Sequence, residues 1–227
     1  MIPTGIILPI LVGPLSGNKW IAGAAAGKGK GLSILFNLAE PKQMSIAMEL
    51  LKPQDICFDI GANVGLYTLL FSQFSKHIFA FEPLPRNISF LVRTVKLNKL
   101  RNVTVITQAV SNQDGLSLFE VNENCAIGKL DSSGSQPVST IQLDTFVESY
   151  NHTPSLIKID VEGGELAVLK GGENTIQQYK PIILLSTHGE SIKSECINFL
   201  ETVNYRCRPI NADDVLHATE FICEFSE

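Results

Sequence analysis

The sequence has no CxxC pair, no charge block, no internal repeat and no apolar stretch long enough to cross a membrane. Without paired cysteines a zinc ribbon is excluded, and the odd count of five cysteines makes a disulfide framework unexpected. A reducing compartment suits such a chain, so we expect a cytoplasmic protein. The apolar opening at residues 6–12 lacks the basic start of a signal peptide and is shorter than the roughly 20 residues that span a bilayer. We expect it to form an edge strand or a hairpin.

Charged residues are also few, at 18%, and acids outnumber bases to give a net charge of −5. This balance disfavours non-specific binding to nucleic acid or to an anionic membrane, so neither is expected as a partner. Hydrophobic residues make up 44% of the 227 residues, which excludes a disordered or fibrous chain. We expect one domain over residues 41–227. An extension rich in Gly and Pro, residues 1–40, precedes it and is expected to form a hairpin or loop, with a possible role as a substrate lid.

Short apolar runs alternate with helical periodicity from Pro41 onward. This alternation predicts an α/β fold with a mostly parallel sheet and helices on both faces. Parallel strands are expected at 56–60, 78–81, 103–107, 156–160 and 182–185. Helices are expected at 64–74, from Pro85 to about residue 98, after the strand at 156–160 as far as the double glycine at 171–172, and at 192–202. An antiparallel excursion is expected at 116–121 and 138–142, a short helix capped by Asp144 after it, and a closing hairpin at 205–210 and 221–225. In such sheets ligands bind beyond the carboxyl ends of the strands, so functional residues are sought there.

The first predicted strand ends in an acid and a glycine-rich turn that runs Asp59, Ile60, Gly61, Ala62, Asn63, Val64, Gly65. Glycines let the backbone turn tightly, and the N-terminus of the next helix offers N–H groups to an anion. Asn63 stands where the GxGxxG loop of dinucleotide-binding proteins has its second glycine. A carboxylate at Asp59 would repel a pyrophosphate but would attract an ammonium and a sulfonium. The loop therefore predicts S-adenosylmethionine as the ligand of Asp59, Gly61, Ala62, Asn63 and Gly65.

The next two strand ends supply candidates for the ribose and the base. Glu82 follows the glycines by about twenty residues, where an acid in nucleotide-binding folds accepts hydrogen bonds from both ribose hydroxyls. Pro83 ends that strand and fixes the turn after it. Gln108 could bond the edge of an adenine, and the small Ala109 could leave room for its ring. We expect Glu82, Pro83, Gln108 and Ala109 to complete the cofactor site.

The strand at 156–160 ends in three acids within six residues, Asp160, Glu162 and Glu165. Crowded carboxylates repel one another unless a cation or a hydrogen-bond donor lies among them. Asp160 should lie beside Asp59 in the sheet and face the reacting centre, as a cofactor contact and a catalytic residue. Glu162 and Glu165 fall in the first turn of a helix, where they complement its dipole. No third ligand for Mg²⁺ is identifiable, so no metal is expected.

Four segments carry a resemblance to a known family: FDIGANVG at 58–65, FEPLPRN at 81–87, LDTF at 143–146 and, most specific, LIKIDVEGGELAVLKG at 156–171. Together they resemble the FkbM-type S-adenosylmethionine-dependent methyltransferases, over about residues 52–189. The resemblance implies a class I methyltransferase fold, Rossmann-like with a seven-stranded sheet. It also implies methyl transfer to a hydroxyl oxygen, typically of a sugar or a natural product.

The sequence departs from the family pattern at one position. After the strand at 182–185 the family usually has an acid and, two residues later, a histidine; here Ser186 replaces the acid and His188 is kept. An alcohol must lose its proton as the new bond forms, and His188, with an ordinary pKa near 6.5, is the expected general base. Asp160 is the second candidate. The missing acid leaves open how His188 is oriented and how basic it is.

Two other functions remain compatible with parts of the sequence. An NAD-dependent Rossmann oxidoreductase would use a similar loop, although the broken GxGxxG pattern and Asp59 count against it. A catalytically inactive S-adenosylmethionine-binding protein would keep the loop, and only the departure at Ser186 supports it. The acceptor cannot be named, because its pocket is expected from residues 1–40, 122–137 and 189–192, where no motif is diagnostic.

Overall fold

The computed structural model describes residues 5–25, 31–121, 128–130 and 134–227. Parts of the segments 1–40 and 122–137, which were expected near the acceptor, lie outside these residues, and so does Cys125. No helix in the described part of the chain combines the length and the hydrophobicity needed to cross a bilayer.

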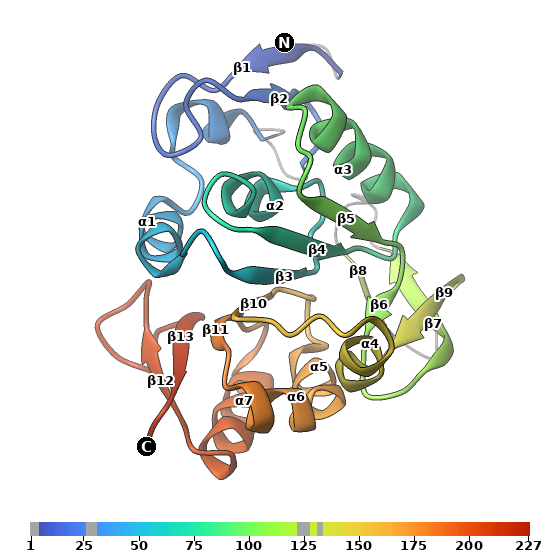
Figure 1. Ribbon diagram of the computed structural model, residues 1–227, viewed down its shortest axis with the longest axis vertical. Helices are drawn as coiled ribbons and strands as arrows, with labels where there is room; N and C mark the ends of the chain where they lie inside the picture. Colours follow the sequence, from blue (N-terminus) through green and yellow to red (C-terminus); the bar gives the residue numbers. More distant parts are fainter. Residues whose placement is uncertain (1–4, 26–30, 122–127, 131–133) are drawn as a thin grey trace.

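Seven strands form the central sheet in the order β12-β13-β11-β10-β3-β4-β5 (Figure 1). The strands are β3 (Ile56–Ile60), β4 (His77–Phe81), β5 (Val103–Ile106), β10 (Leu156–Ile159), β11 (Ile182–Ser186), β12 (Tyr205–Pro209) and β13 (Glu220–Phe225). Strands β5, β4, β3, β10 and β11 are parallel, whereas β13 runs antiparallel to both of its neighbours. The predicted α/β fold with a mostly parallel seven-stranded sheet is confirmed. Because the strand order reverses between β3 and β10, the binding crevice is expected at their carboxyl ends.

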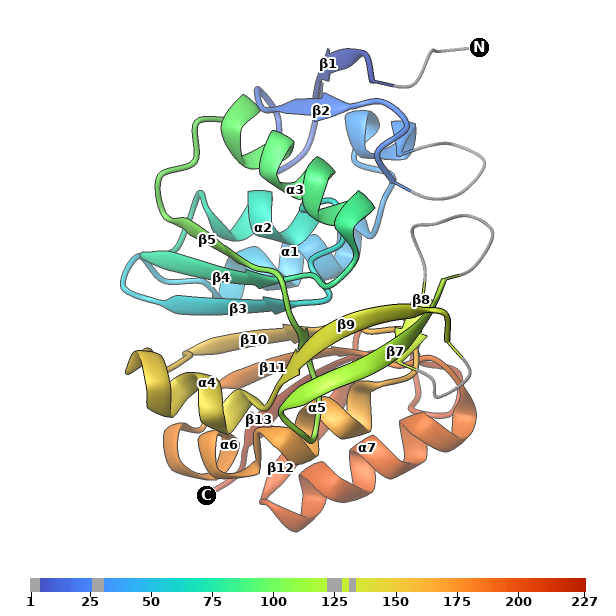
Figure 2. The ribbon, with the colours of Figure 1, turned by 90° about the vertical axis from the view of Figure 1, so that its right-hand side faces the viewer.

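Helices cover both faces of the sheet (Figure 2). On one face lie α1 (Pro41–Leu50), α2 (Leu66–Phe71) and α3 (Pro85–Leu97); on the other lie α4 (Leu143–Tyr150), α5 (Glu165–Gly171), α6 (Glu173–Tyr179) and α7 (Glu190–Thr202). Side chains alternate along each strand, so Cys57 packs in the first core and Phe58 in the second. Neither α1 nor α6 was predicted, and α2 is shorter than the apolar pattern at 64–74 suggested.

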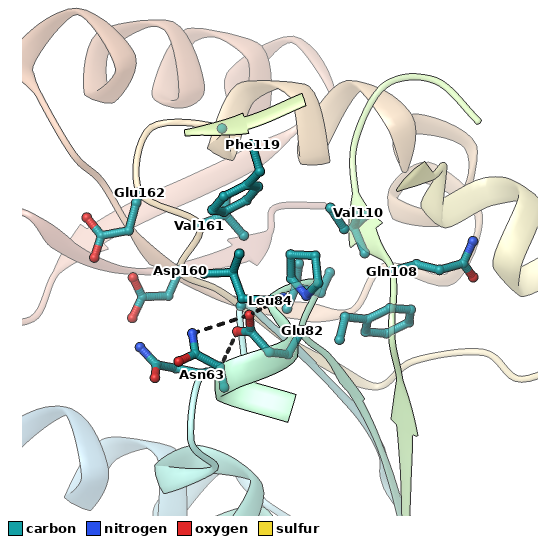
Figure 3. Close-up of a pocket in the computed structure, with 16 residues that line it drawn as sticks. Asn63, Glu82, Leu84, Gln108, Val110, Phe119, Asp160, Val161 and Glu162 are labelled. Atoms are coloured by element: carbon teal, nitrogen blue, oxygen red, sulfur yellow. Dashed lines mark hydrogen bonds between the residues drawn. The ribbon is translucent and has the colours of Figure 1, made fainter. Parts of the chain in front are cut away.

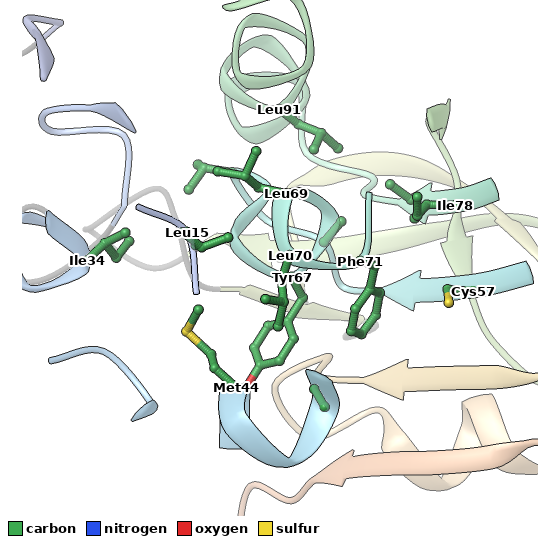
Figure 4. Packing of buried hydrophobic residues seen from close by; sticks show 14 of the residues in the cluster. Leu15, Ile34, Met44, Cys57, Tyr67, Leu69, Leu70, Phe71, Ile78 and Leu91 are labelled. Atoms are coloured by element: carbon green, nitrogen blue, oxygen red, sulfur yellow. The ribbon is translucent and has the colours of Figure 1, made fainter. Parts of the chain in front are cut away.

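The N-terminal segment packs onto the first core. Its strands β1 (Ile7–Pro9) and β2 (Lys19–Ile21) form the predicted hairpin, followed by a 3₁₀ helix, η1 (Leu32–Phe36). Leu15 and Ile34 lie beside Leu69 of α2 in one buried cluster (Figure 4). The side chain of Asn98, which follows α3, bonds both the N–H and the C=O of Lys19.

A smaller sheet is inserted between β5 and α4. It contains β6 (Ala109–Val110), β9 (Gln136–Ile141), β7 (Gly115–Val121) and β8 (Gly128–Leu130), in that order. The antiparallel pairing of β7 with β9 confirms the predicted excursion. This sheet contributes Phe119 and Val110 to one side of the cavity described below.

Two local predictions are wrong. Asp144 does not cap α4, whose N-cap is Gln142 without a side-chain bond; its carboxylate accepts the N–H groups of Asn174 and Thr175 at the start of α6. Helix α6 follows directly on the double glycine where the chain was expected to leave helical structure.

Cys207 and Cys223 are register partners on β12 and β13 and form a disulfide, although no disulfide was expected. The sequence could not show that these two cysteines face each other.

Candidate active site

A cavity opens at the carboxyl ends of β3, β4 and β10 (Figure 3). Of the predicted cofactor residues, seven line it: Gly61, Asn63, Glu82, Pro83, Gln108, Ala109 and Asp160. The other lining residues are Ile60, Phe81, Leu84, Asn87, Val110, Phe119, Val161, Glu162 and Gly164. Three predicted cofactor residues, Asp59, Ala62 and Gly65, do not line it, and neither does His188.

Glu82 is the buried polar centre of the cavity. Its Oε2 accepts the N–H of Asn63 at 2.9 Å, and its Oε1 accepts the N–H of Leu84 at 2.9 Å and the side-chain amide of Asn87 at 3.4 Å. Burial raises the pKa of Glu82 to about 7, although these hydrogen bonds oppose the rise. We call Glu82, Asn63, Leu84 and Asn87 the Glu82 cluster. A carboxylate can accept about four hydrogen bonds, so the cluster leaves Glu82 some capacity for a ligand hydroxyl.

The glycine-rich turn is shaped by the protein itself. The N–H groups of Gly61 and Ala62 both donate to the carbonyl of Phe81. A Cβ on Gly61 would lie 1.8 Å from the carbonyl oxygen of Asp160, so glycine is required there by the approach of the chain after β10. Gly65 has a φ of 95° at the N-cap of α2, and a Cβ there would strike Leu91. The two glycines therefore place the turn against its neighbours, and Gly61 brings Asp160 to the cavity.

Asp59 differs from its prediction, in which its carboxylate faced the bound cofactor. The side chain is buried under α2, where it accepts a hydrogen bond from the hydroxyl of Thr68. Burial raises the pKa of Asp59 to about 6, against the opposing effects of Lys158 and Thr68. Alternation along β3 explains the difference, because Ile60 and not Asp59 points to the cavity side. Asp59 therefore does not line the cavity, although its carboxyl lies close enough to Lys158 and Asp160 for their charges to affect its pKa.

Lys158 connects the buried acids to the cavity edge. Its side chain is 4% exposed, and its Nζ donates to Oδ2 of Asp160 at 2.8 Å. The ammonium also lies 4.4 Å from the ring centroid of Tyr67, whose hydroxyl donates to Glu40 at 2.7 Å. Burial would raise the pKa of Asp160, but Lys158 and, less strongly, His188 outweigh it and hold that pKa below its ordinary value. Asp160 is thus kept as a carboxylate at the cavity edge.

His188 follows β11 and is surrounded by three carboxylates. Its Nδ1 lies 2.7 Å from Oε1 of Glu165, whose side chain is fully buried. Its Nε2 lies 3.4 Å from Glu162 and 3.7 Å from Asp160, both of which line the cavity. The hydrogen bond to Glu165 is the main cause that raises the pKa of His188 to about 9, with burial opposing it and the other two acids adding to it. We call His188, Asp160, Glu162 and Glu165 the His188 cluster.

The departure at Ser186 has a structural reason. Ser186 and Glu220 are register partners on β11 and β13, and the serine hydroxyl donates to the Glu220 carboxylate at 2.8 Å. An acid at position 186 would place two carboxylates opposite each other, which destabilises an antiparallel pair. Burial raises the pKa of Glu220 to about 7, while Lys158 and Ser186 lower it. A serine therefore suits this position because the neighbouring strand already carries an acid.

One group of side chains in the described ranges has the ligand types of a cation site. Asp160, Glu162 and His188 each offer one atom, and these atoms lie within 4.8 Å of one another. The sequence suggested the two acids but no third ligand, because His188 is distant in the chain. Exposed groups of this kind are common without an ion, so the geometry alone does not assign one.

A known protein domain matches the part of the chain that forms both clusters. The methyltransferase FkbM domain matches residues 59–207, which is more than half of the chain and contains both clusters. The chain belongs to the FkbM methyltransferase family. This membership confirms the resemblance drawn from the four sequence segments. It favours a methyltransferase over the NAD-dependent oxidoreductase that the sequence had left open. FkbM methyltransferases use S-adenosylmethionine, which is therefore the cofactor of this protein.

Three similar proteins each match only part of this FkbM protein, and the match spans less than two thirds of the length of the first two. A hexuronic acid methyltransferase, AglP of Haloferax volcanii, is 31% identical over 148 residues, which cover 64% of this chain and 61% of the relative. The methyltransferase FkbM of Methylobacillus flagellatus has a TM-score of 0.55 at 16% identity, over 90% of this chain and 56% of that one. A Streptococcus mutans protein solved with S-adenosylhomocysteine has a TM-score of 0.50 at 12% identity, over 79% and 92%. The solved structures show a class I methyltransferase fold.

The residues of this FkbM cavity fit S-adenosylmethionine. Glu82 would hold the ribose hydroxyls, and the apolar side chains of Leu84, Val110 and Phe119 would line the place of the adenine. Asp160 lies on the other side of Glu82 from Val110 in Figure 3, where its carboxylate would suit the cationic end of the cofactor. Gln108 lies at the slot, but its amide donates to Ser139 at 3.1 Å and is turned from Glu82.

Three residues at or beside this cavity were not predicted from the sequence as site residues: Asn87, Glu165 and Phe119. Asn87 lies in the FEPLPRN segment, and its position two residues after Pro85 at the start of α3 was the available signal. Glu165 was assigned only to the helix dipole, since nothing in the sequence placed it beside His188. Phe119 comes from the inserted sheet, which no motif connects to the cavity.

Proposed function

We propose that this FkbM methyltransferase transfers the methyl group to a hydroxyl oxygen of a sugar or a related small molecule, with His188 as the general base. The observation that carries the proposal is the orientation of His188, whose Nδ1 is bonded to buried Glu165 so that Nε2 is directed toward Asp160 and Glu162 at the cavity edge. S-adenosylmethionine supplies a methyl group already activated on a sulfonium. The protein must supply alignment of the acceptor and removal of its proton.

The charge of the site supports a hydroxyl acceptor. A hydroxyl near pKa 16 needs a base, whereas a carboxylate acceptor needs none. A carboxylate in contact with Asp160 and Glu162 would also be repelled. Sugar hydroxyls, in contrast, can donate hydrogen bonds to both acids. Asp160 is then the cofactor contact on the sulfonium side, and Glu162 is a candidate contact of the acceptor.

The relative from Haloferax volcanii, a hexuronic acid methyltransferase, suggests which acceptors to test first. A hexuronic acid offers both hydroxyls and a carboxylate, so methyl transfer could give an ether or an ester. The hydroxyl proposal favours the ether. That nucleic acid and membrane are not partners stays a prediction.

The test measures S-adenosylhomocysteine release with glucuronides, galacturonides and the matching neutral glycosides, followed by mild alkaline treatment of the product. A methyl ether survives alkali and an ester does not. Release with an alkali-stable methyl group supports the proposal, and an alkali-labile product contradicts it. No release with any hydroxylated acceptor, despite binding of S-adenosylmethionine by calorimetry, would favour an inactive cofactor-binding protein.

A further inference from the structure

Glu165 has contacts that a residue serving only the helix dipole would not need. It is the first residue of α5, its side chain is 0% exposed, and its Oε1 accepts hydrogen bonds from His188 at 2.7 Å and from the N–H of Gly163 at 3.0 Å. Its Oε2 is buried and has no hydrogen-bond partner among the described residues. Burying a carboxylate is costly unless a cation or donors compensate it. Among the described residues, His188 is the side chain that contacts Glu165 and can carry a positive charge.

The backbone before α5 fixes where this carboxylate points. Glu162 and Gly163 both have positive φ, 56° and 102°, so the chain turns sharply between β10 and α5. This turn directs the Gly163 N–H to the same oxygen that bonds His188. A carboxylate held from two sides can in turn hold the imidazole in one orientation.

We propose that Glu165 is the positioning residue of His188, in the role that an acid at position 186 cannot fill in this chain. The carboxylate binds Nδ1–H, which leaves Nε2 free of that proton and directed to the acceptor side. When Nε2 takes the proton of the acceptor hydroxyl, the imidazolium that forms is stabilised by the adjacent charge. The inference rests on the proposed function, in which His188 is the base.

The other charged groups near the ring do not offer this contact. Asp160 and Glu162 lie on the Nε2 side, and Asp160 is already bonded to Lys158. Helix α7, which packs against α5, brings Cys196 near Glu165, and its Glu190 and Lys193 bind each other. Glu220 on β13 is bonded to Ser186. Glu165 is therefore the carboxylate that holds Nδ1.

The test combines E165Q with E162Q as a matched control. Both variants remove one negative charge beside His188, but only E165Q alters the Nδ1 contact. We expect E165Q to lower kcat by about 10²-fold while the affinity for S-adenosylmethionine, measured by calorimetry, stays within about twofold. We expect E162Q to lower kcat by less than about tenfold. The pH at which kcat/KM reaches half its maximum should fall in E165Q by more than in E162Q.

A double-mutant cycle decides whether Glu165 acts through His188. In the H188A background, E165Q should add less than about twofold, because the residue that it positions is absent. An equal loss in both backgrounds, or an unchanged kcat in folded E165Q, overturns the inference.

Nitrogen-15 NMR of the histidine ring tests the contact in the unmodified protein, independently of activity. At pH values at which the imidazole of His188 is neutral, a proton on Nδ1 supports the inference. A proton on Nε2, with Nδ1 deprotonated, overturns it. If H188A keeps full activity while the NMR result holds, the assignment of His188 as base fails and the Glu165 contact stands.

Discussion

The Glu82 cluster and the His188 cluster share one cavity, but their charges are satisfied in different ways. Glu82 receives backbone N–H groups and an amide, all from within 19 residues of it in the chain. His188 instead faces three carboxylates, and its contact with Glu165 spans 23 residues of the chain, across α5, α6 and β11. The amide donors around Glu82 do not titrate, whereas the imidazole of His188 and the acids around it do.

Under the proposed function, this difference separates cofactor binding from chemistry. The Glu82 cluster is an acceptor that depends on local backbone geometry. The His188 cluster is a set of mutually dependent charges, with Lys158 holding Asp160 on one side and Glu165 holding the ring on the other. Variants of the Glu82 cluster should therefore change the affinity for S-adenosylmethionine, whereas variants of His188 and Glu165 should change turnover.

H188A should have the largest effect on the His188 cluster. We expect turnover to fall by about 10²–10⁴-fold, because the base is lost, while the affinity for S-adenosylmethionine survives, because His188 does not line the cavity. Release of S-adenosylhomocysteine and calorimetry measure the two effects. H217A is the matched control, since that side chain is 74% exposed and lies outside the cavity, bonded to Asp214. Unchanged turnover in H188A would remove this residue from the mechanism.

Replacing Lys158 tests whether the acids depend on one buried cation. K158M leaves Asp160 without its ion pair and Asp59 without a nearby positive charge, so we expect the free energy of unfolding at pH 8 to fall by about 3–5 kcal/mol. Urea denaturation measures the loss. K170M, an exposed lysine on α5, should change stability by less than about 0.5 kcal/mol. A loss of less than about 1 kcal/mol in K158M would mean that water solvates the carboxylates of Asp59 and Asp160 once the lysine is removed.

The pH dependence of turnover distinguishes the clusters without a mutation. His188 can accept a proton only when it is neutral, and the carboxylates raise its pKa to about 9. We therefore expect kcat/KM to rise by about fiftyfold between pH 7 and pH 9 and then to level off. Stopped assays across this range, with a saturating concentration of cofactor, provide the profile. A plateau already at pH 7 would contradict the raised pKa.

E82Q should affect the other cluster. We expect the affinity for S-adenosylmethionine to fall by about 10–10²-fold, because hydrogen bonds from hydroxyls to a charged acceptor are lost. Turnover at saturating cofactor should change less than in H188A. An affinity within twofold of the unmodified protein would place the ribose elsewhere.

The same variant should flatten part of the pH dependence of stability. Burial raises the pKa of Glu82 to about 7, so the folded state retains a proton that the unfolded chain releases near the ordinary value. This contribution is full below that ordinary value and is lost as the pH rises through about 7. Between pH 5 and pH 8 the decline in unfolding free energy should therefore be smaller in E82Q by about 2 kcal/mol. Asp59 and Glu220 shift in the same direction and remain in both proteins.

The smallest expected effect lies outside both clusters. D144A removes the carboxylate that accepts two N–H groups at the start of α6, and we expect a loss of about 1 kcal/mol in stability with unchanged kcat. E148A on the exposed side of α4 is the control. Equal stability of the two variants would show that water replaces the Asp144 cap.

The parts of the fold that depend on local pattern were predictable. Short runs of mostly apolar residues marked β3, β4, β10 and β11, and the period of α3 was evident because its apolar residues recur on one face. Helix α6 was missed because the double glycine before it looks like a terminator, whereas Gly171 is there because a Cβ would lie 2.0 Å from the carbonyl of Ser111. Packing against a distant segment leaves no local signal.

For the site, strand ends located Glu82, Asp160 and His188, because parallel strands bring their carboxyl ends to one edge. The sequence alone also determined the family and the cofactor, through the motifs at those ends. The directions of the side chains depend on the three-dimensional packing: Asp59 points toward α2, Glu165 toward His188, and Ser186 toward Glu220. Such directions depend on which strands are neighbours and on which face each residue lies. A linear pattern does not contain that information, because the partners are far apart in the chain.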